Sequence, residues 1–278
     1  MHAGALEQHF DDGIFWRHWP VAKAERVVVL VHGLGEHSGR YEELAEFFNA
    51  RATAVVALDH IGHGLSPGTR CHLSSFEDYL GPLDSLVNQA EALYPDTPKV
   101  LLGHSLGGLI SAAYLLRAQD RFQSAVLSGP ALGIDPALPV WQQKIMQLLS
   151  LLLPKLGAMQ LDASQISRSA DVVEAYKADP LVHNGKISAR LVTELFATLE
   201  NVNARAAEIK LPFKIFHGEG DVMTSPALSK AFVERVTSEL REYQGYPGLY
   251  HEIFNEPERE QVMQDVQAFI ERAATMHS

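Results

Sequence analysis

The 278-residue sequence has one cysteine and comparatively few basic residues, and both scarcities exclude classes of protein. With Cys71 as its only cysteine, the chain cannot form an intramolecular disulfide. Lysine and arginine total 23 against 34 acidic residues, and the net charge of −11 argues against nucleic acid or an anionic membrane surface as an electrostatic partner. The apolar run 145–153 is far shorter than the roughly 20 residues that span a bilayer.

We expect no targeting signal, because residues 1–7 show no basic segment followed by an apolar one. We therefore expect a cytoplasmic protein. Cys71 lies among loop-like residues with no base nearby in the sequence, which favours a free structural thiol over a catalytic one. Hydrophobic residues make up 46% and charged residues 21%, so the chain has ordinary globular composition and ample length for one large α/β domain.

Short β-branched runs alternate with amphipathic helical patterns along most of the chain. Residues 8–10 and 14–19 flank the turn Asp11-Asp12-Gly13 and predict an antiparallel hairpin. Later strands are predicted at 26–31, 54–58, 100–102, 124–127, 213–216 and 241–244. Helical spacing separates them at 41–51, 76–93, 109–116, 226–236 and 262–270. This alternation predicts an α/β fold with right-handed crossovers and a mostly parallel central sheet flanked by helices.

The alternation stops after Pro130. For about eighty residues only helical patterns occur, at 141–153, 170–176 and 188–206. We interpret 131–209 as an inserted helical cap, or lid, and 1–130 with 210–278 as the core. The segment 145–153 is apolar almost all round, which fits either a helix buried between cap and core or a lid helix that touches membrane or lipid aggregates.

The segment 99–108 contains the motif G-x-S-x-G, with Ser105 between Gly103 and Gly107. A strand that reverses into a helix within a few residues strains the middle residue and leaves no room for side chains on either side of it. The serine hydroxyl is therefore expected at the end of the sheet, beside the helix N-terminus. The motif is short and occurs by chance in many proteins, so it does not identify a nucleophile on its own. A serine nucleophile also requires a base, an acid and oxyanion donors.

The partners of Ser105 should lie in loops that follow parallel strands, because these loops gather at the edge of the sheet where the serine emerges. Asp221 and His251 occupy such loops and complete the chain order Ser, Asp, His. Glu219 is a weaker alternative acid, and His217 is expected to help form the turn.

The same geometry suggests two backbone donors for an oxyanion. One is the N–H of the residue after the serine, Leu106, and the other is that of Leu34 in the loop after the strand 26–31.

Several other polar residues are expected to have structural roles. His104 is expected to be packed, and Asp59 to cap its loop. Two glycine-rich loops bring histidines toward one edge, but their spacing matches no metal motif, so we expect no metal there. A serine nucleophile with a histidine base also needs no cofactor. These histidines are His32, His37, His60 and His63.

With these residues in place, nearly the whole chain resembles the α/β-hydrolase superfamily, and within it the monoacylglycerol lipases and lysophospholipase-like serine hydrolases. Five ordered motifs carry the resemblance. They are HGLGEHSGRY at 32–41, DHIGHGLS at 59–66, GHSLGG at 103–108, HGEGD at 217–221 and YHEIFNE at 250–256.

The resemblance implies Ser105, Asp221 and His251 as the catalytic triad, together with the oxyanion hole above and a cap over an apolar acyl tunnel. It also suggests that Glu36 and Arg40 lie near the polar head of the substrate, with a loop-fixing ion pair as the alternative. Leu106 stands where this family often has methionine, a conservative difference because the donor is backbone.

The sequence thus predicts a cytoplasmic serine hydrolase that cleaves monoacylglycerols through an acyl-enzyme. An apolar cap on an acidic exterior favours a single-chain lipid ester, with transient membrane or micelle contact through the cap. Lysophospholipase or general carboxylesterase activity is the nearest alternative. A catalytically silent binding module is a third hypothesis, and labelling by a fluorophosphonate would discriminate it.

Overall fold

The computed structural model describes residues 6–133 and 139–276. Eight strands form one sheet in the order β1-β2-β4-β3-β5-β6-β9-β10, in which β1 and β2 are antiparallel to their neighbours and the other strands are parallel. The strands are β1 (Glu7–Asp11), β2 (Ile14–Trp19), β3 (Arg26–Val31), β4 (Thr53–Leu58), β5 (Lys99–His104), β6 (Ser124–Ser128), β9 (Phe213–Gly218) and β10 (Arg241–Tyr246). The predicted hairpin and mostly parallel sheet are therefore confirmed.

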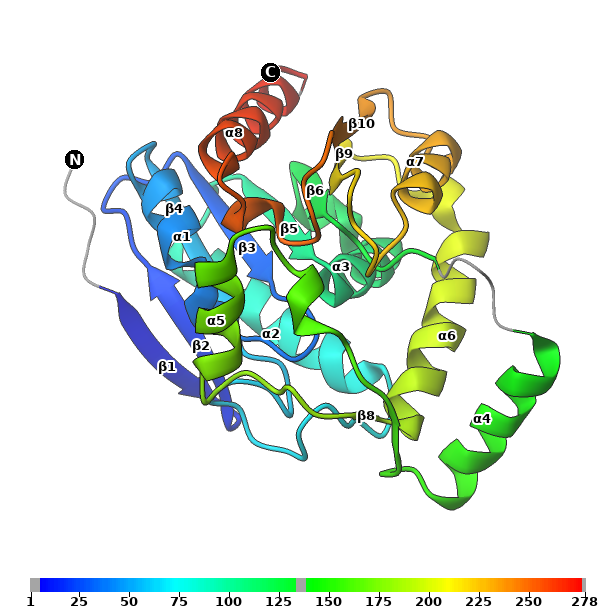
Figure 1. Cartoon of the computed structure of the whole chain (residues 1–278). Coiled ribbons are helices and arrows are strands. Elements are labelled where there is room, and N and C mark those ends of the chain that lie inside the picture. Colours follow the sequence, from blue (N-terminus) through cyan, green and yellow to red (C-terminus); the bar gives the residue numbers. More distant parts are fainter. Residues whose placement is uncertain (1–5, 134–138, 277–278) are drawn as a thin grey trace.

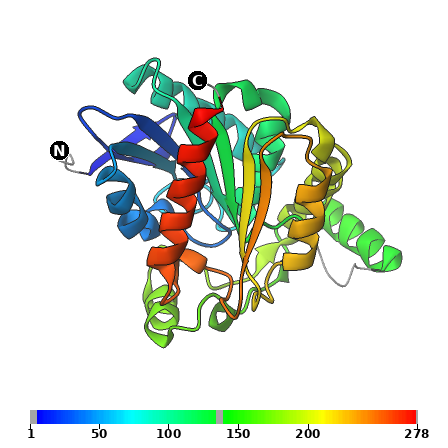
Figure 2. The same cartoon turned by 90° about the horizontal axis from the view of Figure 1, so that it is seen from above.

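Helices cover both faces of the sheet (Figures 1 and 2). Successive residues of a strand point to opposite faces: in β3, Val27 and Val29 pack in one core and Val28 and Leu30 in the other. The first core also takes in α2 (Glu77–Leu93), α3 (Leu106–Ala118) and α7 (Pro226–Arg235). The second takes in α1 (Glu42–Asn49) and α8 (Arg259–Thr275). Burial on both faces explains why the central strands are continuous apolar runs.

The segment between β6 and β9 lies outside the large sheet. It contains α4 (Val140–Leu152), α5 (Ala170–Ala178) and α6 (Ala189–Ala204), close to the predicted helices, whereas 134–138 lie outside the described residues. It also forms a small antiparallel sheet from β7 (Gly157–Met159) and β8 (Ile187–Ser188), which the sequence analysis did not predict. Strands of three and two residues are too short to carry a period of two.

Helix α4 extends from the body of the molecule, with α6 on one side of it (Figure 1). Its leucines are open to solvent, with Leu148, Leu151 and Leu152 55%, 70% and 65% exposed. The expectation of a helix buried between cap and core is therefore wrong, and its alternative, an outward apolar face, agrees with the structure. Among the described residues, no helix is long and apolar enough to cross a membrane.

Candidate active site

Ser105 occupies the turn between β5 and α3 in a strained backbone conformation. Its φ of 54° is in the left-handed region, and it is the N-cap residue of α3. A Cβ added to Gly103 would lie 2.4 Å from the Gly107 carbonyl oxygen, and one added to Gly107 would lie 2.0 Å from the Val31 carbonyl oxygen. Only glycine fits at these two positions, so the local sequence sets the sharp turn that the motif predicts.

The loops after β9 and β10 bring Asp221 and His251 to this serine. Ser105 Oγ lies 2.8 Å from His251 Nε2, and Asp221 Oδ2 lies 2.7 Å from His251 Nδ1. Because Nδ1–H donates to the carboxylate, the unprotonated Nε2 faces the serine hydroxyl and can accept its proton. His251 is 3% exposed and Asp221 6%, so the contacts are shielded from water. All three residues predicted from loop position and chain order are thus brought within hydrogen-bonding distance.

Asp221 has further partners that the sequence does not reveal. The N–H groups of Met223 and Thr224 donate to its Oδ1, and the Thr224 hydroxyl donates to Oδ2 at 2.7 Å. His217 Nε2 also lies 3.0 Å from Oδ2. The sequence predicts only that His217 helps to form the turn. The available signal was its position four residues before Asp221 across the turn Gly218-Glu219-Gly220.

The electrostatics of the two ionisable partners oppose each other. Burial favours a higher pKa for the Asp221 carboxyl, but the His251 charge and the hydrogen bonds from His217, His251 and Thr224 dominate and leave this pKa far below its usual range. Burial favours a lower pKa for His251, yet the charge and hydrogen bond of Asp221 outweigh burial and raise it. Asp221 therefore stays ionised and can stabilise a proton on His251.

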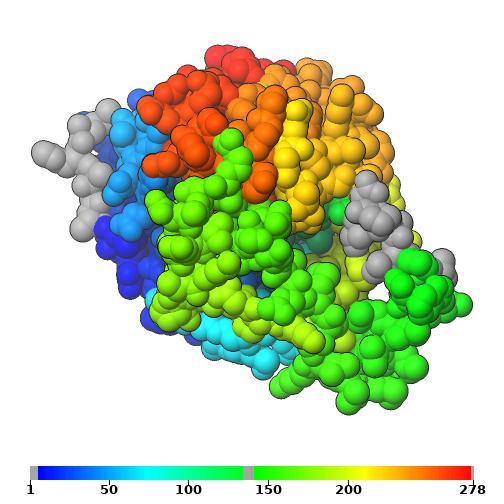
Figure 3. Space-filling model, viewed as in Figure 1, coloured from blue at the N-terminus to red at the C-terminus, as the bar shows by residue number. Residues whose placement is uncertain are grey.

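An apolar cavity of about 610 Å³ opens at Ser105 and His251. Its walls come from α3, α6, the segment after β7 and the loop after Asp221, and Figure 3 shows the surface hollowed between the green and the yellow-to-orange segments. The lining includes Leu109, Leu161, Val192, Leu195, Phe196 and Leu199.

Leu34 and Leu106 line the same cavity as Ser105. The loop of Leu34 passes beside the serine, because a Cβ added to Gly33 would lie 3.1 Å from Ser105 Cβ. Two backbone segments that could supply oxyanion donors therefore flank the hydroxyl.

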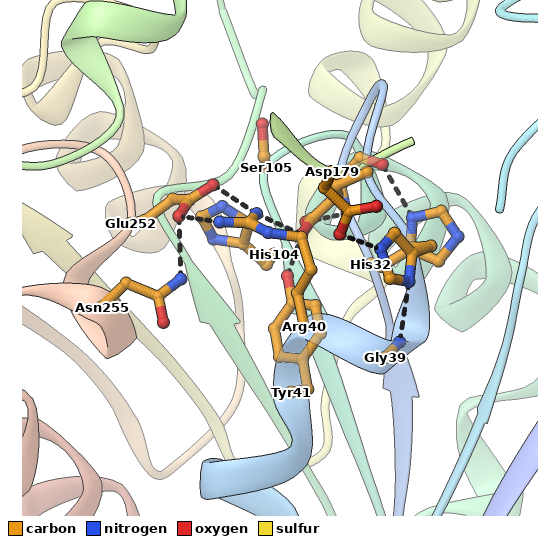
Figure 4. A network of polar contacts seen from close by, with 12 residues as sticks. His32, Gly39, Arg40, Tyr41, His104, Ser105, Asp179, Glu252 and Asn255 are labelled. Carbon is orange, nitrogen blue, oxygen red and sulfur yellow. Dashed lines mark hydrogen bonds and ion pairs between the residues drawn. The ribbon is translucent and has the colours of Figure 1, made fainter. Parts of the chain in front are cut away.

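Glu36 and Arg40 are absent from the cavity lining and belong instead to a buried polar network, and Figure 4 shows Arg40, Tyr41 and Glu252 of this network below Ser105. Glu36 Oε1 accepts from the Gly33 N–H and the Tyr41 hydroxyl, both at 2.6 Å, and Glu36 Oε2 accepts from Arg40 at 2.8 Å. Arg40 also binds Glu252. These contacts correspond to the loop-fixing alternative and give no support to a head-group role.

The other residues considered for the site lie outside the triad. Glu219 is exposed on the surface of its turn. His104 is buried, hydrogen-bonds the Ser128 carbonyl oxygen at 3.0 Å and has its pKa lowered to about 4, chiefly by burial. Asp59 accepts from Ser38 and from the Leu65 N–H, so it caps its loop as expected.

The four histidines weighed as metal ligands hydrogen-bond to protein groups. His32, His60 and His63 each use a ring nitrogen on a backbone carbonyl, and His37 bonds to Asp179 at 2.8 Å. The Cys71 thiol is buried beside His63, and burial raises its pKa to about 12, which suits a structural thiol.

A different group, Glu7, His9 and His18 of the hairpin, has ligand-type atoms within 4.8 Å of one another. The two ring nitrogens of His18 hydrogen-bond Glu7 and the Tyr94 hydroxyl at 2.9 and 2.8 Å. Both ring nitrogens of the buried His18 therefore have partners within the protein.

A mostly parallel sheet with helices on both faces, and serine, histidine and aspartate on the loops after its strands, define an α/β-hydrolase. A family model described as "Serine aminopeptidase, S33" matches residues 22–258, and the chain belongs to this family.

Relatives within this group include lipases. The chain is 42% identical to a monoacylglycerol lipase of Mycolicibacterium smegmatis, over 88% of this chain and 87% of the relative. It is 31% identical to the phospholipase YtpA of Bacillus subtilis, over 91% and 98% of the two chains. The crystal structure of the monoacylglycerol lipase of Paleococcus ferrophilus superposes with a TM-score of 0.84 at 33% identity, covering 93% of this chain and 98% of that one.

Proposed function

We propose that this protein is a carboxylic ester hydrolase that cleaves monoacylglycerols to fatty acid and glycerol, with Ser105 as nucleophile. The observation that carries the proposal is the Ser105–His251–Asp221 hydrogen-bonded chain, with distances of 2.8 and 2.7 Å, at the wall of an apolar cavity. Monoacylglycerol lipases at 42% and 33% identity over most of the chain support this substrate.

In the proposed reaction, Ser105 Oγ attacks the ester carbonyl carbon while His251 Nε2 takes the hydroxyl proton. Asp221 holds the imidazole in the required tautomer and stabilises its charged form. The N–H groups of Leu34 and Leu106 stabilise the oxyanion, typically by about 3 kcal/mol each. When the carbon–oxygen bond to glycerol breaks, His251 gives its proton to the departing alkoxide, which leaves the acyl group on Ser105.

Water completes the cycle. His251 takes a proton from the water, whose oxygen attacks the acyl carbon, and the bond to Ser105 Oγ then breaks. The serine regains a proton from His251, and the fatty acid leaves. Each step uses side chains and backbone groups of this chain, so the proposal requires no cofactor.

We assign 131–209 the role of a cap that forms part of the substrate cavity, with 1–130 and 210–278 as the core. Support comes from α6 and the segment after β7, which contribute Leu161, Phe196 and Leu199 to the cavity wall. The base of the proposed cap contacts the core loops. The His183 N–H donates to the Gly35 carbonyl oxygen, and His37 bonds to Asp179. A single acyl chain fits a cavity with this apolar lining.

Transient contact with membranes or micelles is a further part of the proposal. The exposed leucines of α4 continue into Leu153 and Leu156, which are 55% and 44% exposed. Several exposed leucines on one short helix favour an interfacial contact, and α4 lies beside the α6 wall of the cavity. The cytoplasmic location stays a prediction.

Lysophospholipid or small-ester hydrolysis is the alternative function, supported by the relative named a phospholipase at 31% identity. The same triad would catalyse this reaction, and only the residues that bind the polar head group of the substrate would differ. Rates on monoacylglycerols, lysophospholipids and p-nitrophenyl esters of matched chain length would separate these activities.

The test of the proposal is hydrolysis of mono-, di- and triacylglycerols, together with fluorophosphonate labelling of the wild type and Ser105→Ala. We expect labelling of the wild type only, and the highest kcat/KM on monoacylglycerols. Equal or greater activity on triacylglycerols would rule out the substrate class. Persistent labelling of Ser105→Ala would rule out the nucleophile, and an unlabelled, inactive wild type would indicate a binding module.

A further inference from the structure

We infer that His217 is a positioning residue, which donates a second imidazole hydrogen bond to Asp221 and so sets how strongly this carboxylate holds a proton on His251. The inference rests on the proposed function, because it assigns Asp221 and His251 to the triad. His217 lies near the end of β9 with its side chain fully buried, and it is absent from the cavity lining. Any effect on catalysis would therefore act through Asp221.

The contacts of His217 determine which ring nitrogen carries its proton. Nε2 lies 3.0 Å from Asp221 Oδ2, whereas Nδ1 is buried and has no hydrogen-bond partner within the described part of the chain. A proton on Nδ1 would leave a buried N–H unsatisfied and would turn a lone pair of Nε2 toward the carboxylate. A neutral ring with the proton on Nε2 avoids both costs, so His217 is a donor to Asp221.

The bond from His217 ends on the same carboxylate oxygen that receives the His251 proton. Oδ2 lies 3.0 Å from His217 Nε2, 2.7 Å from His251 Nδ1 and 2.7 Å from the Thr224 hydroxyl. Donors that share one oxygen compete for its negative charge, and each weakens the attraction that the carboxylate exerts on the others. His217 therefore limits how far Asp221 favours protonated His251.

This limit matters because His251 must be neutral to accept the serine proton. With the His217 bond removed, Asp221 would hold the protonated imidazole more strongly and the pKa of His251 would rise further. A larger share of the enzyme would then be protonated and inactive at neutral pH. The bond also restrains rotation of the carboxylate, which keeps Oδ2 directed at Nδ1.

The other ionisable groups around Asp221 and His251 stay in place when His217 is replaced. Those acting on His251 are Glu252 and Glu36, which raise its pKa, with the His104 ring 4.9 Å away. On β10, burial raises the pKa of Tyr243, and the negative charges of Glu219 and Asp221 raise it further, to about 12. None of them donates to Asp221 Oδ2 in its place, so the loss of His217 has no ready substitute there.

The experiment compares His217→Phe, which keeps the ring volume but cannot donate, with His217→Gln, whose amide N–H₂ can reach the carboxylate. On a short ester in solution, we expect His217→Phe to move the acid limb of kcat/KM upward by about half a pH unit. We also expect kcat at pH 7 to fall by up to about threefold, the most that a half-unit shift allows, while KM stays unchanged. His217→Gln should restore the position of the limb and most of kcat.

Stability is not the readout for this role. His217→Phe removes a buried nitrogen without a partner, but it also takes one hydrogen bond from the buried Asp221 carboxylate, so we expect its Tm to fall modestly while the enzyme stays folded. The matched control is His60→Phe, because His60 is also buried and also has an unpartnered Nδ1 in the described structure, but it does not bond to the triad. This control should leave the acid limb at its wild-type pH.

Two results would overturn the role of His217: an acid limb in folded His217→Phe that matches the wild type, or a shifted limb that His217→Gln fails to restore. Fluorophosphonate labelling of Ser105 tests the proposed function separately. A labelled, active wild type with an unshifted His217→Phe refutes only the positioning role, whereas a wild type without labelling refutes both.

Discussion

Arg40 binds Glu252 through two parallel hydrogen bonds, Nη1 to Oε1 at 2.6 Å and Nη2 to Oε2 at 2.7 Å, although the two residues are 212 positions apart. Glu252 directly follows His251, and Arg40 also binds Glu36, which accepts from the Gly33 N–H beside Ser105. One guanidinium therefore joins the loop that carries the proposed oxyanion donor to the loop that carries the proposed base (Figure 4).

Removal of this guanidinium should destabilise the fold. Burial disfavours ionised Glu252, but Arg40 overcomes this effect and lowers the pKa of Glu252 to about 2. In Arg40→Gln two buried carboxylates lose their cation, and we expect a loss of about 3–5 kcal/mol in the free energy of unfolding. Arg40→Lys should recover only part, because an ammonium cannot bind both oxygens in parallel. Urea unfolding measures both variants.

The matched control is Arg117→Gln, because Arg117 makes a similar paired contact with Glu77 on the surface. Its side chain is 52% exposed, so we expect a change below about 1 kcal/mol. Equal losses in the two glutamine variants would show that the Arg40 network contributes nothing beyond a surface ion pair.

The pH dependence of kcat/KM should reflect His251. Because Asp221 outweighs burial and raises the pKa of His251, the acid limb should lie above about pH 6.5, the usual value for histidine. Activity is lost as the pH falls through this limb, since protonated His251 cannot accept the serine proton. Rates on an uncharged short ester between pH 5 and 9 measure it. A limb below pH 6 would contradict the assignment, and His104→Gln, which removes a ring already neutral in this range, should not move it.

Replacement of Asp221 by asparagine should reduce kcat by about ten-thousandfold without unfolding the protein. Both oxygens accept hydrogen bonds, Oδ1 from the Met223 and Thr224 N–H groups and Oδ2 from His251. An amide with its N–H₂ at the Oδ1 position faces two backbone N–H donors, whereas an amide with its N–H₂ at the Oδ2 position faces Nδ1–H of His251 and disturbs the imidazole tautomer. Single-turnover kinetics with circular dichroism test this. A folded Asp221→Asn enzyme of near-normal rate would show that the acid is misassigned.

The core and the three site residues were predictable because short-range rules determine them. Strand β3 coincides with the predicted range 26–31, since burial on both faces requires the apolar side chains that follow Arg26. The glycines beside Ser105 mark positions where a Cβ has no room. Loop position and chain order then singled out Asp221 and His251 among 13 histidines and 34 acidic residues.

What could not be predicted depends on contacts between distant segments or on weak local patterns. The Arg40–Glu252 pair spans 212 positions. From the sequence alone, Arg40 could equally bind other residues of its loop or the polar head group of the substrate. The bond from His217 to Asp221 depends on the curvature of the turn after β9. For α4, an apolar helix has the same pattern whether it is buried or exposed, so the sequence left both alternatives open.

A larger side chain in the cavity should discriminate between acyl chains. Leu199→Trp places added volume at the α6 wall, so we expect kcat/KM for a 16-carbon monoacylglycerol to fall at least tenfold relative to a 4-carbon ester. The control Ala197→Trp lies on an exposed position of the same helix and should leave the ratio unchanged. Chain-length profiles measure the ratio, and equal losses on both esters would place the acyl chain elsewhere.

Polar substitutions on the exposed face of α4 should lower the rate of hydrolysis of aggregated substrate and leave the rate on dissolved substrate unchanged. Leu148→Ser, Leu151→Ser and Leu152→Ser together remove apolar surface that is already exposed, so Tm should hold. Each leucine buried in lipid contributes up to about 2 kcal/mol, and we expect binding to phosphatidylcholine vesicles to fall at least tenfold. Phe10→Ser removes a 66% exposed apolar side chain on β1 and serves as control. Unchanged vesicle binding by the triple variant, measured by co-sedimentation, would exclude α4 as the contact surface.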